Sequence, residues 1–402
     1  SKSSLIIFDM NFQNGFNYGA EPFSDLNNNN VYDNGEPFVD IGLIDPTPAV
    51  QSFPIKNSAP TIFWNELSVL PDTSFPAMSF GWEAEDVDGN ETIQNINIAL
   101  NDTLNPSNIV SLNGAVRRIT LRTNDFSSAS PLMEIMIEGS ENNINSEKLG
   151  GLKLDDNNRL FVQAVDISGA KSNYIVLPDT NKTWFIKKPK GKLLIIDDYI
   201  TPDNSESFYN SMFDSLGLTN KFDIYDIHNQ IPPYINITFL ETIKLFDYIF
   251  WYSDNSPSLD LASSTVQKYI ISGGKAAFSF QFPQSVDLSL LQSFLPINAD
   301  SSSFKTSLLA GTKISSDTTN PDYPNLELSI GIFRARAFYL NLLGGVPIYY
   351  FPNKELNGFI GFSSIDKDKF FIGVPLNKSN AGEANVRKLL QKVFIDDFGL
   401  IP

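Results

Sequence analysis

The stretch that decides the fold is Lys192-Leu193-Leu194-Ile195-Ile196-Asp197-Asp198-Tyr199. Its short apolar run ends in polar residues and a helical pattern follows, which is typical of the first strand of a parallel sheet. Strands of similar character are predicted at 222–227, 248–252 and 275–279. Helices are predicted between them, so the pattern indicates an open α/β sheet with right-handed crossovers.

Polar and aromatic residues stand where these predicted strands end. In parallel sheets, ligands and catalytic groups gather beyond the carboxyl ends of the strands. We therefore expect a ligand pocket formed by Asp197, Asp198, Trp251, Tyr252, Ser253, Asp254, Ser279 and Gln281. The aspartates have two open interpretations: they serve a glycosidase or hold a metal ion, or they cap the helices that follow the strands.

The order of these motifs resembles the class I glutamine amidotransferase-like, or flavodoxin-like, fold. The matching segments are 194–198, 247–252 and 273–279, and the likeness resumes at 369–376 with a last helix at 384–393. The chain is most similar to divergent bacterial versions related to trehalose-utilisation-type domains. Residues 284–365 stand out as an insertion or elaboration of that pattern.

The resemblance implies positions for a catalytic cysteine and for a histidine-glutamate pair, and this chain departs from the family at both. Phe278-Ser279-Phe280-Gln281 stands in place of the cysteine, and Pro375-Leu376-Asn377-Lys378 in place of the pair. Neither stretch supplies a thiol or an imidazole, so we expect no amidotransferase activity. A serine hydrolase pair of Ser279 with His228 is a further alternative, but the G-x-S-x-G turn is missing.

Composition excludes several classes of function. The chain has 402 residues, which predicts two or three domains, and a net charge of −17, which disfavours nucleic acid and anionic lipid as main partners. It contains no cysteine and one histidine, His228. Disulfides, thiolate metal sites and triads with two histidines are therefore excluded.

The ends and apolar runs of the chain bear on its location. No run approaches the roughly 20 apolar residues that span a bilayer, so we expect no transmembrane segment. The sequence as given begins at Ser1 without the pattern of a signal peptide, and we expect a mature or trimmed form. The polar start, residues 1–4, is compatible with a processed or lipid-modified N-terminus, so a lipid anchor there is one expectation.

Three parts are predicted along the chain: a calcium-loop segment and linker at 1–57, a β-sandwich at 58–188 and the α/β domain at 190–402. Alternating runs at 78–84, 93–100, 116–122 and 159–165 predict the sandwich. The run from Phe161 to Ser172, and the Trp82 strand with the turn after it, resemble immunoglobulin-like and fibronectin type III domains of bacterial extracellular proteins. In that turn, Asp86, Asp88 and Asn90 form either a second cation site or an ordinary Asp-Gly turn.

The N-terminal segment contains a pattern typical of calcium loops. Positions 1, 3, 5, 7, 9 and 12 of an EF-hand-type loop are occupied by Asp25, Asn27, Asn29, Val31, Asp33 and Glu36. The sixth position is Asn30 rather than glycine, and asparagine tolerates the left-handed conformation that this position requires. We expect structural Ca²⁺ here; the alternative is a solvated turn without metal.

These observations favour a non-catalytic exported protein, of the Bacteroidota kind by resemblance. It would act as an interaction or scaffold subunit, with a protein partner in an outer-membrane or cell-surface assembly. The alternative is a carbohydrate-active enzyme or glycan-binding protein that uses Trp251, Tyr252, Asp254, Asp197 and Asp198. An intracellular small-molecule-binding protein is a third hypothesis.

Overall fold

The computed structural model describes residues 2–6, 23–30, 33, 35–37, 50–54, 57–201, 203–254, 256–282, 286–301, 306–353 and 355–402. The protein is β-rich and multidomain, and it divides into two compact units, Ser1–Ser58 and Ala59–Pro402. In the first unit, β1 (Lys2–Ile6) pairs antiparallel with β2 (Val50–Pro54). None of the helices in the described ranges combines the length and apolarity needed to cross a membrane.

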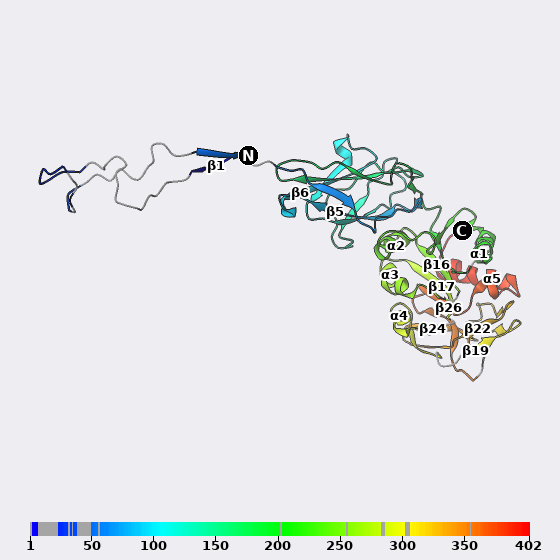
Figure 1. Ribbon diagram of the computed structural model, residues 1–402. Helices are drawn as coiled ribbons and strands as arrows, with labels where there is room; N and C mark the ends of the chain where they lie inside the picture. The colour runs from blue at the N-terminus through cyan, green and yellow to red at the C-terminus, as the bar shows by residue number, and fades with distance from the viewer. Residues whose placement is uncertain are drawn as a thin grey trace. The chain divides into compact units, whose positions relative to one another are not determined.

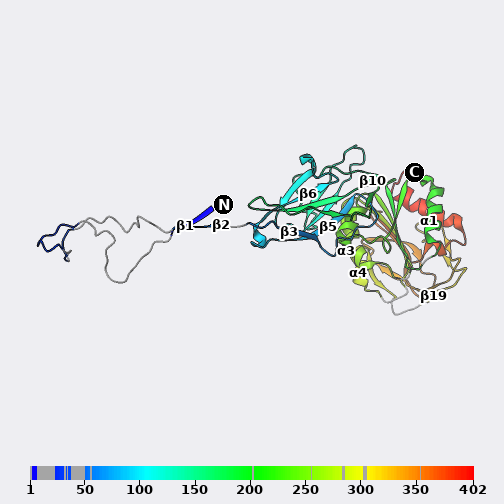
Figure 2. The ribbon, with the colours of Figure 1, turned by 45° about the horizontal axis from the view of Figure 1, so that its top comes forward.

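The second unit begins with two four-stranded antiparallel sheets, which we call the two-sheet region (residues 61–186). One sheet has the order β3 (Thr61–Trp64), β5 (Ala77–Glu85), β8 (Arg118–Arg122), β9 (Glu134–Ile137). The other has the order β12 (Ile175–Leu177), β11 (Leu160–Asp166), β6 (Ile93–Leu100), β7 (Ile109–Asn113). Figure 2 labels β5 of the first sheet and β6 of the second.

A single apolar core lies between these two sheets. Alternate residues of β6 enter it, including Ile96, Ile98 and Leu100, because successive side chains of a strand point to opposite faces. Trp82 is fully buried there, and its indole Nε1 donates to the carbonyl oxygen of Val116 at 3.0 Å. A buried indole keeps its hydrogen bond in this way, so burying Trp82 leaves no unpaired donor.

A larger sheet follows, and we call its part of the chain the mixed-sheet region (residues 193–397). Five adjacent strands are parallel, in the spatial order β15 (Phe222–Asp226), β14 (Leu193–Asp198), β16 (Tyr248–Ser253), β17 (Lys275–Phe280), β26 (Lys369–Ile372). Beyond β26 the sheet continues antiparallel through β25 (Phe359–Ser364), β23 (Phe338–Leu340) and β18 (Ile297–Asp300), and β24 (Gly345–Tyr350) also pairs with β25.

Helices cover both faces of the parallel strands (Figure 1). One face carries α1 (Ser205–Phe213) and α5 (Glu383–Leu390); the other carries α2 (Ile235–Ile243), α3 (Leu259–Ile271) and α4 (Leu288–Gln292). Leu193 and Ile195 of β14 pack into the first core, whereas Leu194 and Ile196 pack into the second. This explains why the deciding stretch is continuously apolar: a strand covered on both faces has no solvent-facing side.

The remaining elements are short. The described residues of the segment 284–365, which the family resemblance left unplaced, supply α4 and the antiparallel part of the sheet. They also form two antiparallel strand pairs, β19 with β22 and β20 with β21, which pack on the α1 side. The short elements are β4 (Thr73–Ser74), β10 (Asp156–Asn157), β13 (Phe185–Ile186), β19 (Thr306–Leu308), β20 (Lys313–Ile314), β21 (Leu326–Glu327), β22 (Ile332–Ala335), η1 (Asn90–Thr92), η2 (Pro106–Asn108), η3 (Asp214–Leu218), η4 (Leu376–Lys378) and η5 (Gln391–Asp397).

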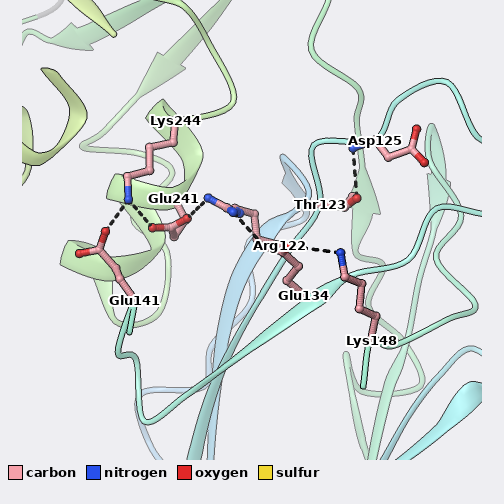
Figure 3. A network of polar contacts seen from close by, with 8 residues as sticks. All are labelled: Arg122, Thr123, Asp125, Glu134, Glu141, Lys148, Glu241 and Lys244. Carbon is pink, nitrogen blue, oxygen red and sulfur yellow. Dashed lines mark hydrogen bonds and ion pairs between the residues drawn. The ribbon is translucent and has the colours of Figure 1, made fainter. Parts of the chain in front are cut away.

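An ionic network joins the two regions of the second unit, and we call it the clasp: Arg122, Glu134, Glu141, Glu241, Lys244 and Lys268 (Figure 3 draws all but Lys268). The fully buried Glu241 of α2 lies 2.6 Å from Arg122 Nη1 of β8 and 3.0 Å from Lys244 Nζ. Glu134 binds the other guanidinium nitrogen, and Glu141 binds Lys244 and Lys268. The buried carboxylate therefore faces two cations, and each cation has a second acidic partner.

Hydrogen bonds and apolar contacts accompany the clasp. The Thr238 hydroxyl of α2 donates to Ser79 Oγ at 2.8 Å, and Ser79 in turn pairs with Thr120 of β8. Phe75 packs its ring against Phe246, with centroids 5.2 Å apart. Thr238 and Glu241 thus give α2 polar contacts with the two-sheet region, beside a small apolar contact.

Candidate functional site

The carboxyl ends of β14, β16 and β17 meet at one edge of the sheet, where the sequence predicted a ligand pocket. Their register places Asp198 beside Ser253, and Ser253 beside Phe280. All eight predicted residues lie at this edge or directly beyond it, and only Asp197 is less than fully buried. Side chains this enclosed need partners inside the protein.

Asp198 is the most heavily bonded of these residues. Its carboxylate accepts from the Ser258 backbone N–H at 2.7 Å, the Ser258 hydroxyl at 2.8 Å and the Trp251 indole at 3.0 Å. Burial raises the pKa of Asp198 to about 6, outweighing the hydrogen bonds, which act in the opposite direction. Asp198 thus ties the end of β14 to β16 and to Ser258, the residue that precedes α3.

His228 lies against the same carboxylate. Its Nε2 is 2.8 Å from Asp198 Oδ1, an ion-pair distance, although the ring N–H is not aligned for a hydrogen bond. One third of the side chain is exposed. His228 therefore lies against Asp198, whereas the Ser279 hydroxyl bonds to Val374 and Leu376, so the alternative of a Ser279–His228 pair has no hydrogen bond to support it.

Ser279 joins two strands instead. Its side chain is fully buried, its hydroxyl donates to the Val374 carbonyl at 2.9 Å, and its oxygen accepts from the Leu376 N–H at 3.2 Å. Asn377 next to it donates to Asp203 Oδ2 at 3.1 Å and accepts from the Tyr199 hydroxyl at 3.2 Å. The segment after β26 thus closes over the end of β17, and the serine hydroxyl has no open face.

The other predicted residues serve similar purposes. The Ser253 hydroxyl donates to the Asp198 carbonyl at 3.0 Å, and the Gln281 amide donates to the Phe333 carbonyl at 3.2 Å. Tyr252 packs against Tyr209 with centroids 4.4 Å apart, on the α1 face, and Trp251 packs against aromatic rings on the α2 face. Neither ring presents a face to solvent.

Asp197 and Asp254 complete the set. Asp197 Oδ1 accepts from the Tyr199 N–H at 3.0 Å, and burial raises the pKa of Asp197 above its ordinary value. Asp254 is buried, and its Oδ1 lies 3.5 Å from the Ile200 nitrogen. Both carboxylates face the loop that leaves β14, so they organise this turn.

A cavity of about 550 Å³ lies beside these buried residues, in the segments that follow β15, β16 and β17. His228 and Ser258 form part of its wall, together with apolar side chains such as Ile235, Phe282 and Leu290. None of the eight predicted residues lines it. Sequence reasoning missed it because it examined the last residues of each strand, whereas the space opens among the loops and helix starts that come next.

The described part of the calcium loop is folded around its own acidic residues. Asp25 accepts from the backbone N–H groups of Asn27, Asn29 and Asn30, and the bond from Asn30 is the main reason that the pKa of Asp25 is lowered. Asn30 has a φ of 61°, the left-handed conformation expected at the sixth position. The loop backbone therefore turns as the motif requires, with asparagine in place of glycine.

The remaining loop residues converge in the same way. Asp33 Oδ2 accepts from the Asn27 and Asn29 side-chain amides at 2.6 and 2.7 Å, and Glu36 accepts from the N–H groups of Leu26 and Asp33. The predicted ligand Val31 lies outside the described residues. Within the described part of the chain, no three acidic or histidine side chains are close enough to hold a metal. The donor types and the turn nevertheless fit a hard cation, which prefers carboxylate and amide oxygens.

The proposed second cation site, Asp86 with Asp88 and Asn90, forms a turn. Asn90 Oδ1 accepts from the Asp86 N–H at 3.0 Å, and Asp86 Oδ1 accepts from the Asp88 N–H at 2.9 Å. Gly89 supplies the positive φ, 112°. The backbone of the turn thus uses Asn90 Oδ1 and Asp86 Oδ1, which is the usual role of such residues, whereas Asp86 Oδ2 is buried without a hydrogen-bond partner among the described residues.

Comparison of the sequence with protein-family models and with curated proteins finds no match.

Proposed function

We propose that this chain is a non-catalytic interaction or scaffold subunit of a cell-surface or outer-membrane assembly, stabilised by calcium. The observation that carries the proposal is the state of Ser279. Its hydroxyl is buried and makes two hydrogen bonds to the segment after β26, at the place where the amidotransferase-like resemblance puts the nucleophile. A nucleophile must be open to its substrate and paired with a base.

The strand order supports the flavodoxin-like part of this proposal. The parallel strands follow one another in space as second, first, third, fourth and fifth along the chain, the order of flavodoxin-like sheets. The two facing antiparallel sheets of the two-sheet region support an immunoglobulin-like or fibronectin type III-like sandwich. Such a sandwich is a common spacer in exported bacterial proteins.

Glycan recognition through the strand-end aromatics receives no support from the geometry. Trp251 and Tyr252 are fully buried and packed on opposite faces of the sheet. Stacking on a sugar requires an exposed ring face, which neither residue has. We therefore propose protein recognition rather than glycan recognition.

Calcium would support the N-terminal segment. Asp25, Asn27, Asn29, Asp33, Glu36 and the Val31 carbonyl would hold the ion, and an extracellular module of this kind binds Ca²⁺ with a Kd of roughly 10⁻⁴ to 10⁻³ M. The ion would neutralise carboxylates that the loop now satisfies with its own N–H donors. Calcium at that affinity is saturating only outside the cytoplasm, which agrees with an exported protein.

Two experiments test the proposal. The full chain, tagged at its C-terminus and expressed in the producing cell, should fractionate with the envelope and retain a stable protein partner after crosslinking. The chain and its Ser279→Ala variant should be equally inactive on a panel of amide and ester substrates. Turnover that the wild type shows and the variant lacks would overturn the non-catalytic assignment. A cytoplasmic location without a partner would overturn the assignment to a cell-surface or outer-membrane assembly.

A further inference from the structure

The cavity beside Asp198 has a size and lining suited to a small organic ligand. Its volume, about 550 Å³, falls in the range of roughly 300–1,000 Å³ that is usual for ligand sites. Apolar side chains contribute most of its wall, and a few polar groups converge on it from three loops. It lies at the carboxyl-end edge of the parallel strands, where such sheets place their ligands.

The cavity lining carries negative charge. Asp260, in the first turn of α3, and Asp287, which precedes α4, both line the cavity and are exposed. Hydrogen bonds from the Ser289 hydroxyl and N–H lower the pKa of Asp287, so it stays ionised at neutral pH. Among the described lining residues there is no lysine or arginine.

His228 also lines the cavity, and the Asp198 carboxylate stands 2.8 Å from its Nε2. The one imidazole of the lining therefore has an acidic neighbour of its own. A concave site with walls of one sign concentrates ligands of the opposite sign and repels those of its own.

We propose that this cavity binds a small organic cation, an amine or quaternary ammonium with an apolar body. The apolar body packs on Ile235, Phe282 and Leu290, and the cationic head lies near Asp260 and Asp287. The proposal is independent of the calcium loop and of the protein partner. Its failure would leave the proposed function untouched, and the reverse also holds.

The test compares three probes with the same apolar body. Binding of 4-phenylbutylammonium, 4-phenylbutanol and 4-phenylbutanoate to the full chain is measured by titration calorimetry at low salt and about pH 7.5. The ammonium should bind about tenfold more tightly than the alcohol, because two exposed carboxylates each contribute a modest amount. The carboxylate probe should bind most weakly, and added salt should weaken only the ammonium.

Variants locate the head group and the body. Asp260→Asn and Asp287→Asn should each weaken the ammonium about threefold and leave the alcohol unchanged. Asparagine is as good an N-cap as aspartate, so the second substitution preserves the start of α4. Asp322→Asn, at an exposed aspartate that does not line the cavity, is the matched control. Ile231→Trp, at an exposed lining position, should weaken all three probes.

Equal binding of alcohol and ammonium, tighter binding of the carboxylate, or no binding of any probe would each overturn the proposal. So would an effect of Asp322→Asn as large as that of Asp260→Asn. Preferential ammonium binding that both lining substitutions weaken would support it.

Discussion

Glu241 is the buried acid of the clasp between the two-sheet and mixed-sheet regions. It belongs to α2, its side chain is fully buried, and it meets Arg122 at 2.6 Å and Lys244 at 3.0 Å. Removing one partner of a buried ion pair costs about 3–5 kcal/mol, because the other charge is left uncompensated. We consider the substitution Glu241→Gln, which keeps the shape and removes the charge.

The structure places the expected cost at the lower end of that range. Arg122 retains Glu134 at 2.9 Å, and Lys244 retains Glu141, so neither cation is left alone. The glutamine can still accept one hydrogen bond. We therefore expect Glu241→Gln to lower the free energy of unfolding by about 3 kcal/mol. Glu134→Gln, at a partly exposed position, should cost no more than about 1 kcal/mol and serves as control.

Two optical probes can follow the two regions separately in one denaturant titration. Three of the four tryptophans, Trp64, Trp82 and Trp184, lie in the two-sheet region, so fluorescence reports mainly on it. The described α-helices lie in the mixed-sheet region, so circular dichroism at 222 nm reports on that region. The fluorescence and circular dichroism transitions should have the same denaturant midpoint in the wild type. In Glu241→Gln both midpoints should fall to lower denaturant concentrations and should differ from each other.

If Glu241→Gln unfolds at the same denaturant concentration as Glu134→Gln, the buried carboxylate does not couple the regions. A second check is the pair Arg122→Met with Glu241→Leu. Replacing both charges by apolar side chains should cost less than the sum of the two single changes, because Arg122 and Glu241 interact directly at 2.6 Å.

Three further predictions concern the strand ends and the loop. Adding EGTA should expose the segment around residues 23–37 to proteolysis, and Glu36→Gln should do the same in saturating Ca²⁺; equal cleavage with and without calcium would refute the metal site. Burial raises the pKa of Asp198 from 3.8 to about 6, so the folded state holds this proton more tightly and stability falls as pH rises between these values. The contribution is about 3 kcal/mol, and it should appear as a pH-dependent difference between wild type and Asp198→Asn in chemical unfolding; a constant difference would refute it. Ser279→Ala should lower the free energy of unfolding by about 1–3 kcal/mol, because the Leu376 N–H loses its buried acceptor, and a neutral effect would show that the hydroxyl does not join the strands.

Some of this architecture follows from local sequence alone. The run from Leu193 to Ile196 predicts a strand covered on both faces, because only such a strand can be apolar at every position. The spacing from Asp25 to Glu36 predicts the shape of a loop, and Asn30 adopts the left-handed conformation that this shape needs. These features depend on residues close together in the chain, so periodicity and turn chemistry are sufficient.

Only the tertiary structure decided what the strand-end residues do. Asp198, Ser253 and Ser279 have the composition of a site, but their neighbours in space use up their hydrogen bonds. The cavity arises from three loops, and the clasp joins Arg122 to Glu241 across 119 positions of sequence. Such partners are set by how crossovers and regions pack against one another. No local pattern encodes that packing, so the sequence by itself determined the elements and the structure determined which polar groups remain free to act.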